Sequence, residues 1–194
     1  KELKELNIRY FDPTQAYCPE RVDKGLSEAL MLKRARCTLY FAQESETLGK
    51  DSELASTLAQ GKAVIAYVPN GDEAFVSRLI NEAKQIYELK SHNQILLDLL
   101  KLYKPSLAWE DERIKTWVTD VEKANPDEIE SLLRKVVKEV LDKKEDTLRN
   151  NHPLGFQVHL ENGVANGVLV VRNDDDCAKL LRSILLDNMN FSLI

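Results

Sequence analysis

Two short apolar segments on either side of a helical stretch constrain the fold more than any other feature of this chain. Residues 38–42 and 63–68 are rich in β-branched and aromatic residues, which favours strands. Their apolar character is nearly continuous and does not alternate with polar residues, which is typical of strands covered on both faces. The sequence therefore predicts a parallel α/β sheet in which a helix connects these two strands.

The segment between these strands predicts a helix over residues 52–60. Its packing face is formed by small and apolar side chains, Leu54, Ala55, Leu58 and Ala59. Gly61 is a suitable C-terminal stop, and Asp51 or Ser52 can cap the N-terminus. Glu53 would then lie in the first turn, where the helix dipole favours a carboxylate. Ligands bind beyond the carboxyl ends of parallel strands, so Glu53 is a candidate site residue, although many such acids only help to cap a helix.

The stretch 53–65, Glu-Leu-Ala-Ser-Thr-Leu-Ala-Gln-Gly-Lys-Ala-Val-Ile, resembles TIR-domain NAD hydrolases and nucleoside 2-deoxyribosyltransferases. In those families a catalytic Glu opens a helix of small and apolar residues, which ends in Gly-Lys before a hydrophobic strand. Residues 7–13, Asn-Ile-Arg-Tyr-Phe-Asp-Pro, resemble their second strand and the loop after it, and a helix predicted over 23–36 fits the same order. The resemblance covers roughly residues 6–69 and implies a flavodoxin-like fold.

The chain also departs from both families. No Trp precedes Glu53, where Lys50, Asp51 and Ser52 stand instead, and Gly49 is closer to the transferase pattern. The first strand of either family has no counterpart before residue 7. By this resemblance we expect the sequence to be a piece of a longer protein, with more chain before it and after its apolar last residues.

The resemblance implies cleavage of an N-glycosidic bond with Glu53 as the catalytic residue. Breaking the bond between a ribose C1′ and its base gives an oxocarbenium-like transition state, which a carboxylate can stabilise or trap. The loop 43–51 would lie beside Glu53 and offers polar side chains for ribose hydroxyls or phosphate, namely Ser45, Thr47, Lys50 and Asp51. Polar clusters of this kind are also typical of simple solvated turns.

The loop after the predicted strand 8–11 supplies the remaining candidates for substrate binding. These are Phe11, Asp12 and Tyr17. A base or nicotinamide ring could stack on Tyr17 or Phe11, although aromatic residues near strand ends more often belong to the core. By the resemblance, the loop 11–20 would also be completed by a neighbouring subunit, which makes self-association an expected condition for activity.

Composition limits the other functional classes. The chain has 194 residues and a net charge of −5, which gives no general case for binding nucleic acid or an anionic membrane. No apolar run approaches the ~20 residues of a membrane span. Three widely spaced cysteines indicate reduced thiols, and we expect a cytoplasmic protein. The three histidines form no pair at ligand spacing, so we expect no metal. By the resemblance NAD would be the substrate, and we expect no cofactor.

Beyond the two strands the pattern becomes helical and then returns to strands. Helices are predicted over 73–103, capped by Asp72, and over 111–123 and 127–148. Strands over 155–160 and 164–171 flank Glu-Asn-Gly, which indicates a hairpin, and Asn173 can cap a last helix. We therefore divide the chain into an α/β core at 1–71 that lacks its first strand, a helical region at 72–149, and a hairpin with a helix at 150–194.

These observations favour a nucleotide N-glycosidic bond hydrolase. By the resemblance it would be a TIR-like NAD glycohydrolase that acts in immune or cell-suicide signalling. One alternative is a hydrolase similar to nucleoside or nucleotide deoxyribosyltransferases. The other is a module that binds a nucleotide signal, or another such module, without cleaving anything.

Overall fold

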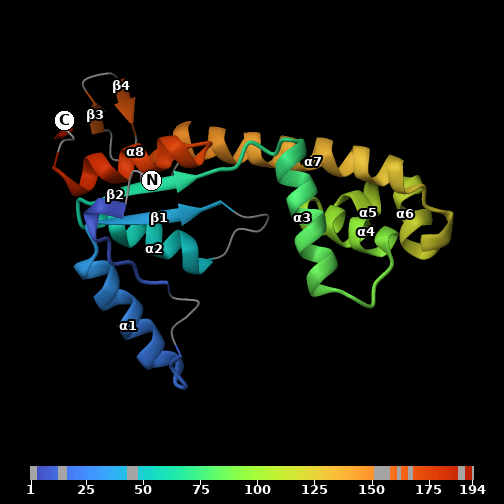
Figure 1. Ribbon diagram of the computed structural model, residues 1–194, viewed down its shortest axis with the longest axis horizontal. Helices are drawn as coiled ribbons and strands as arrows, with labels where there is room; N and C mark the ends of the chain where they lie inside the picture. The colour runs from blue at the N-terminus through green and yellow to red at the C-terminus, as the bar shows by residue number, and fades with distance from the viewer. Residues whose placement is uncertain are drawn as a thin grey trace. The chain divides into compact units, whose positions relative to one another are not determined.

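The computed structural model consists of two compact units, which are described separately. It describes residues 4–12, 17–42, 48–150, 158–160, 163–165, 168–187 and 191–193. Unit 1 comprises Lys1–Phe41, Glu46–Val68 and Asp146–Ile194, and unit 2 comprises Ala42–Ser45 and Pro69–Glu145. The fold is of the mixed α/β class (Figure 1).

Unit 1 contains a three-stranded parallel sheet. Its strands are β1 (Cys37–Phe41), β2 (Ala63–Tyr67) and β5 (Val168–Val171), in the order β1-β2-β5. Cys37 pairs with Ala63, and Val64 pairs with Val168. The prediction that the two apolar segments are adjacent parallel strands is confirmed. β2 is central, and this position explains its continuous apolar sequence, because both faces and both edges are covered.

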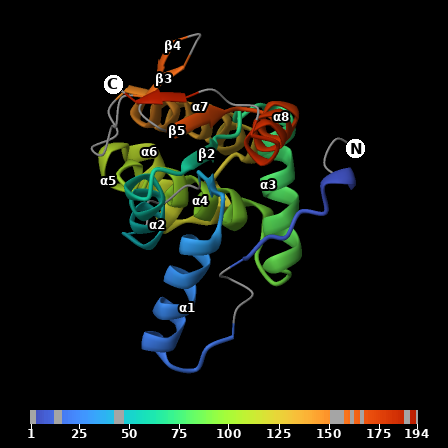
Figure 2. The same cartoon turned by 90° about the vertical axis from the view of Figure 1, so that its left-hand side faces the viewer.

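The two faces of this sheet carry different helices. Successive strand residues point to opposite faces, so Val64 and Ile65 face different layers. Ile65 packs with Leu169, Val171 and Ile184, and the last of these belongs to helix α8 (Asp174–Leu185). Helix α2 (Leu48–Ala59) contacts β1 and β2. Figure 2 shows α2 and α8 on opposite sides of the strands.

An arginine joins the start of β1 to the end of α8. Arg36 Nη1 donates to the Leu185 carbonyl at 2.9 Å, and Nη2 donates to the Ile184 carbonyl at 3.3 Å. The same guanidinium pairs with Asp187. Because the last carbonyls of a helix lack partners within the helix, these bonds stabilise the C-terminal end of α8.

The strand predicted over residues 8–11 is absent from the structure. Residues 7–12 form no strand, Asn7 has a positive φ of 42°, and Tyr10 is exposed. Arg9 and the exposed Tyr10 give this segment no continuous apolar face, so it gains little from being covered on both sides. The third strand of the parallel sheet comes from β5, whose four residues are all buried.

The single strand predicted over residues 164–171 is two strands in the structure. β3 (Val158–Leu160) and β4 (Gly163–Ala165) pair antiparallel, which confirms the hairpin. β6 (Phe191–Leu193) pairs with the other edge of β3. The remainder of the predicted strand is β5, which joins the parallel sheet instead, so the two parts of one apolar run belong to different sheets.

Unit 2 is helical. It contains α3 (Glu73–Ile86), α4 (His92–Tyr103), α5 (Leu107–Glu110), α6 (Glu112–Thr119), the 3-10 helix η3 (Val121–Lys123) and most of α7 (Pro126–Asn150). Its core is lined by Val76, Ile80, Leu96, Leu100, Ile114, Trp117, Ile129, Leu133 and Val137. None of the helices in the described ranges is long and apolar enough to cross a membrane.

The helix predicted over residues 73–103 is broken at residues 87–91. The apolar spacing continues on both sides of the break, which is why the pattern suggested one element. Ser91 begins the second helix because its side chain accepts a hydrogen bond from the Gln94 N–H at 3.3 Å. The helix predicted over 111–123 likewise consists of α6 followed by η3.

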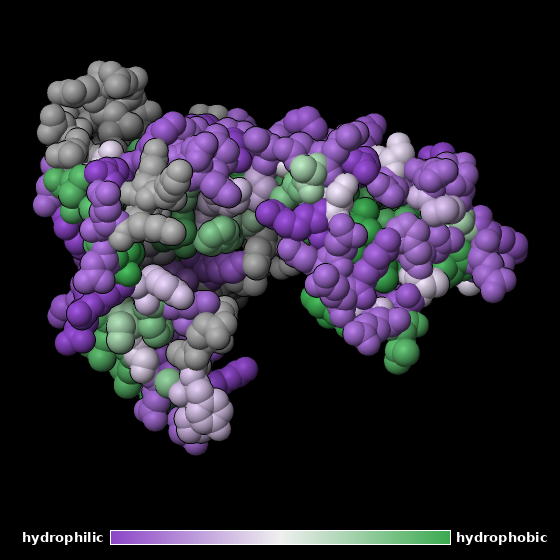
Figure 3. Space-filling view, viewed as in Figure 1, coloured by the Kyte–Doolittle hydropathy of each residue, from purple (hydrophilic) through white to green (hydrophobic). Residues whose placement is uncertain are grey.

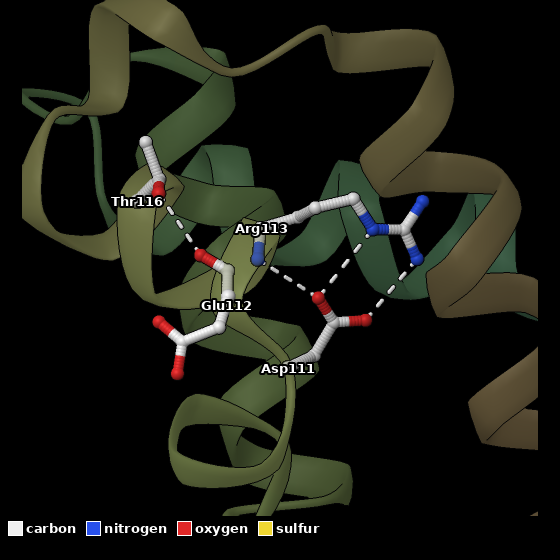
Figure 4. Close-up of polar contacts among 4 residues, drawn as sticks. All are labelled: Asp111, Glu112, Arg113 and Thr116. Atoms are coloured by element: carbon white, nitrogen blue, oxygen red, sulfur yellow. Dashed lines mark hydrogen bonds and ion pairs between the residues drawn. The ribbon is translucent and has the colours of Figure 1, made fainter.

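Acidic caps define other helix starts. The Asp72 carboxylate accepts a hydrogen bond from the Phe75 N–H at 2.8 Å, as the sequence predicted. Figure 4 shows Asp111 at the start of α6, where it accepts from the Arg113 N–H at 2.9 Å and pairs with the Arg113 guanidinium at 3.1 Å. In the same view Thr116 Oγ1 donates to the Glu112 carbonyl at 2.9 Å. Each cap satisfies a donor that the helix itself leaves unpaired.

Two glycines with positive φ should respond differently to substitution by alanine. Gly61 has φ 68° with open space around its Cα, and Gly71 has φ 64° with the Lys138 Cα 3.1 Å from an added Cβ. Gly61→Ala should cost about 1 kcal/mol from the left-handed conformation alone. Gly71→Ala should cost about 1–3 kcal/mol more because backbone must move. Urea unfolding of both variants measures the difference, and equal losses would contradict it.

Candidate functional site

Glu53 lies in the second turn of α2 and not in the first. The helix begins at Leu48, so Asp51 occupies the first turn and Glu53 is the sixth helical residue. The prediction that Asp51 or Ser52 caps the helix is therefore wrong. The sequence Lys50-Asp51-Ser52 resembles a cap because it is polar, but it contains no residue that prevents a helix from extending toward its N-terminus.

A chain of hydroxyl groups fixes the backbone of Glu53 to the sheet. Thr57 Oγ1 donates to the Glu53 carbonyl at 2.8 Å. Its oxygen lies 2.6 Å from Thr38 Oγ1 on β1, and since the Thr57 proton is already used, Thr38 is the donor. Thr57 is buried. Because α2 connects two parallel strands, it runs back along them, and its earlier residues lie nearer the carboxyl end of β1. Glu53 precedes Thr57 by one helical turn of about 5.4 Å and therefore lies toward that end.

The Glu53 side chain is half-buried, and helix α1 (Arg21–Arg34), which contacts α2, carries charged residues close enough to act on its pKa. On that helix Lys24 Nζ lies 3.8 Å from a carboxylate oxygen of Glu28. Burial raises the pKa of the Glu53 carboxyl above its ordinary value. The negative charge of Glu28 raises this pKa further, and the positive charges of Lys50 and Lys24 lower it. We call these four residues, Lys24, Glu28, Lys50 and Glu53, the charged cluster.

This arrangement has definite chemical capabilities. A half-buried carboxylate acts on a nearby cation more strongly than an exposed one, because less water screens it. Glu28 supplies a second carboxylate that acts on Glu53, and glycosidases use pairs of carboxylates at their active sites. The two lysines supply positive charge suitable for phosphate oxygens. The charged cluster could therefore stabilise a glycosyl cation and hold an anionic substrate.

Sequence reasoning missed Lys24 and Glu28. Their spacing of four residues places both on one face of a helix, and this was the available signal. Such pairs normally lie on a solvated surface, so nothing in the pattern connected them with Glu53. Their role depends on the packing of α1 against α2.

The other predicted site residues are not all brought together. Lys50 belongs to the charged cluster, whereas Asp51 is exposed on the same helix. Phe11 is 41% exposed and Tyr17 is 89% exposed, and within the described ranges neither makes a hydrogen bond or a ring contact. Asp12 is half-buried in the segment 7–12. Ser45 and Thr47 lie outside the described residues.

The raised pKa of Glu53 predicts how its replacement changes stability. The folded state binds this proton more tightly than the unfolded chain, so ionisation destabilises the fold as pH rises from about 4, the ordinary titration range of Glu. Glu53→Gln should therefore raise the Tm at pH 7 by about 1–2 °C, the scale of a surface-charge change. The gain should disappear below about pH 4, where both states are protonated.

Asp51→Asn is the matched control for this measurement. Asp51 lies in the first turn of the same helix, where its negative charge interacts favourably with the dipole, so its removal should lower the Tm. Thermal unfolding followed by circular dichroism at several pH values distinguishes the two. A Glu53→Gln variant that is less stable than the native chain at pH 7 would contradict the prediction.

Three comparisons were made for this chain, with models of protein families, with curated proteins and with solved structures, and none of them gives a match.

Proposed function

We propose that this protein cleaves the N-glycosidic bond of a nucleotide, with NAD or a related nucleotide as substrate and Glu53 as the catalytic carboxylate. The proposal includes a flavodoxin-like, TIR-like arrangement of the α/β unit. The observation that carries it is the placement of Glu53. This carboxylate is half-buried and lies within electrostatic reach of charges on α1, and the backbone of the same residue is held to β1 through Thr57 and Thr38.

The reaction needs little besides well-placed charge. The bond between C1′ and the base nitrogen breaks, and its electron pair leaves with the base. The positive charge that develops on the ribose is stabilised by the Glu53 carboxylate, and a water oxygen then adds to C1′ with release of a proton. Nicotinamide leaves NAD as a neutral molecule, so this step requires no proton donor. Lys24 and Lys50 would attract the phosphates.

The resemblance of residues 53–65 to TIR-domain hydrolases supports the same reaction. It also motivates the proposed role in immune or cell-suicide signalling within the cytoplasm, with self-association as a condition for activity. The departures before Glu53 leave the transferase-like hydrolase as the nearest variant of this proposal. That variant would act on deoxynucleosides or deoxynucleotides.

A second candidate function is nucleotide binding without cleavage. It is favoured by the two lysines of the charged cluster, because these could hold an anionic nucleotide whether or not Glu53 reacts. A binding module would show a rise in Tm with NAD and would leave the NAD intact.

Separate incubations with NAD and with deoxynucleosides test these functions. Chromatography follows free nicotinamide or free base, and a second base added to the deoxynucleoside reaction detects transfer. We expect nicotinamide release from NAD. Release only from deoxynucleosides would favour the transferase-like hydrolase, and thermal stabilisation without release would favour the binding module.

A further inference from the structure

Helix α1 turns its polar face toward the rest of unit 1 and its apolar face outward. Ser27, Glu28 and Leu32 are half-buried, and Lys62 Nζ donates to the Leu32 carbonyl at 2.9 Å. The opposite face presents Val22, Leu26 and Leu30, which are 73%, 58% and 59% exposed. These three side chains recur every fourth residue, so they form one stripe along the helix. In Figure 3 apolar atoms are visible over the part of the molecule that α1 forms.

Small residues lie beside this stripe, which we call the α1 stripe and define as Val22, Leu26 and Leu30. Gly25 and Ala29 are exposed, and a Cβ added at Gly25 would meet nothing within 4 Å. Small residues on a helix face allow another helix to approach closely. A fully solvated surface helix is normally polar there, so an apolar stripe of this kind marks an interaction surface.

Two opposite charges flank the same stripe at its two ends. Asp23 lies in the first turn and Arg34 in the last. Both are exposed, and neither forms an ion pair within the described ranges. They are eleven residues apart, which is about three helical turns, so they lie on the same flank of the helix. In an antiparallel helix pair, residues on the same flank face each other across the contact.

We infer that the α1 stripe is the contact surface for a second copy of this chain, with the two α1 helices antiparallel across a two-fold axis. Leu26 would pack beside the partner's Leu30, and Asp23 would face the partner's Arg34. A two-fold axis perpendicular to the helices pairs residues whose numbers have the same midpoint. This midpoint is 28 for Leu26 with Leu30 and 28.5 for Asp23 with Arg34, so one axis fits both pairs. Symmetry forms each contact twice, as expected of a self-complementary surface.

The direction of the pairing follows from the charges. In a parallel pair each flank of one helix faces the opposite flank of the other, so Asp23 would not meet the partner's Arg34. An antiparallel pair brings the acidic end of each helix to the basic end of the other and also opposes the two helix dipoles. The α1 stripe is separate from the charged cluster, because neither Asp23 nor the stripe belongs to it, and it would supply the self-association that the proposed function includes.

Sedimentation velocity of the full chain over a concentration series tests this surface. We expect the native chain to form a reversible dimer. Its dissociation constant should rise about tenfold in Asp23→Arg and in Arg34→Asp. In the double variant, which exchanges the charges, it should return to within about threefold of the native value. Leu26→Gln should leave a monomer. Leu89→Gln, which replaces an exposed leucine of unit 2, is the control and should dimerise like the native chain.

Thermal unfolding at low concentration checks that the variants keep the fold, since all four positions are exposed. A native chain that stays monomeric at about 100 µM overturns the inference, and would leave the stripe to a different protein. Single charge variants that dimerise like the native chain also overturn it. The antiparallel pairing is contradicted if the double variant dimerises no more tightly than the single variant that dimerises less tightly.

Discussion

We expect replacement of Glu53 by Gln to lower the rate of base release at least about 100-fold, the scale of losing one electrostatic stabiliser. Gln keeps the size of the side chain and its position one turn before Thr57. It removes only the negative charge that would face the developing ribosyl cation. Because the backbone of Glu53 is held through Thr57 and Thr38, the substitution should not displace α2.

The control is Glu82→Gln, which removes one negative charge from an exposed position on helix α3 of unit 2. It should change the rate by less than a few fold, since an exposed charge is well screened by water. Steady-state rates for both variants, with circular dichroism as a check on folding, distinguish a specific role from a general charge effect. Equal losses in the two variants would contradict the assignment of Glu53.

The second large effect concerns stability. Ile65→Ala should destabilise unit 1 by about 2–5 kcal/mol, because it removes a buried side chain from the centre of the parallel sheet and leaves a cavity. Ile65 is fully buried against Leu169, Val171 and Ile184, so the loss affects both β2 and α8.

Ile86→Ala is the matched control, because Ile86 is exposed at the end of α3 and its truncation should stay within about 0.5 kcal/mol. Urea unfolding combined with hydrogen exchange measures the change separately in each unit. Rapid exchange in β2, β5 and α8 of the Ile65→Ala variant is the expected signature. Native protection in those elements would show that the sheet does not depend on this contact.

The part of the fold that the sequence predicted is the part governed by local patterns. β1, α2 and β2 follow from two continuous apolar runs, a stripe of small and apolar residues, and Gly61, whose positive φ ends the helix. Gly61 N–H donates to the Leu58 carbonyl at 2.8 Å, as expected of a helix stop. These signals lie within a few residues of the elements that they define.

The errors have a different origin. The third strand of the sheet is β5, about 100 residues beyond β2, and its apolar run was predicted as part of a hairpin strand over 164–171 instead of a strand of the parallel sheet. Both β5 and the segment 8–11 are short and contain β-branched or aromatic residues. The choice depends on burial, which β5 achieves on both faces and residues 8–11 do not. Tertiary packing therefore overrides local propensity at this position.

The candidate site shows the same division. Glu53 was identified from its position between a strand and a helix. The sequence placed it in the wrong turn of α2, because the polar residues before it are compatible both with a cap and with a helix. Lys24 and Glu28 were missed because their relevance arises from the packing of α1 against α2. An amphipathic helix is expected to turn its apolar stripe inward, and α1 turns its stripe outward.

The most direct test of the central proposal is a time course of nicotinamide release from NAD by the native chain and by Glu53→Gln at the same protein concentration. The proposal predicts nicotinamide and ADP-ribose in equal amounts with the native chain, and a rate at least about 100-fold lower with the variant. Intact NAD after incubation with the native chain, or equal release by both proteins, would contradict it.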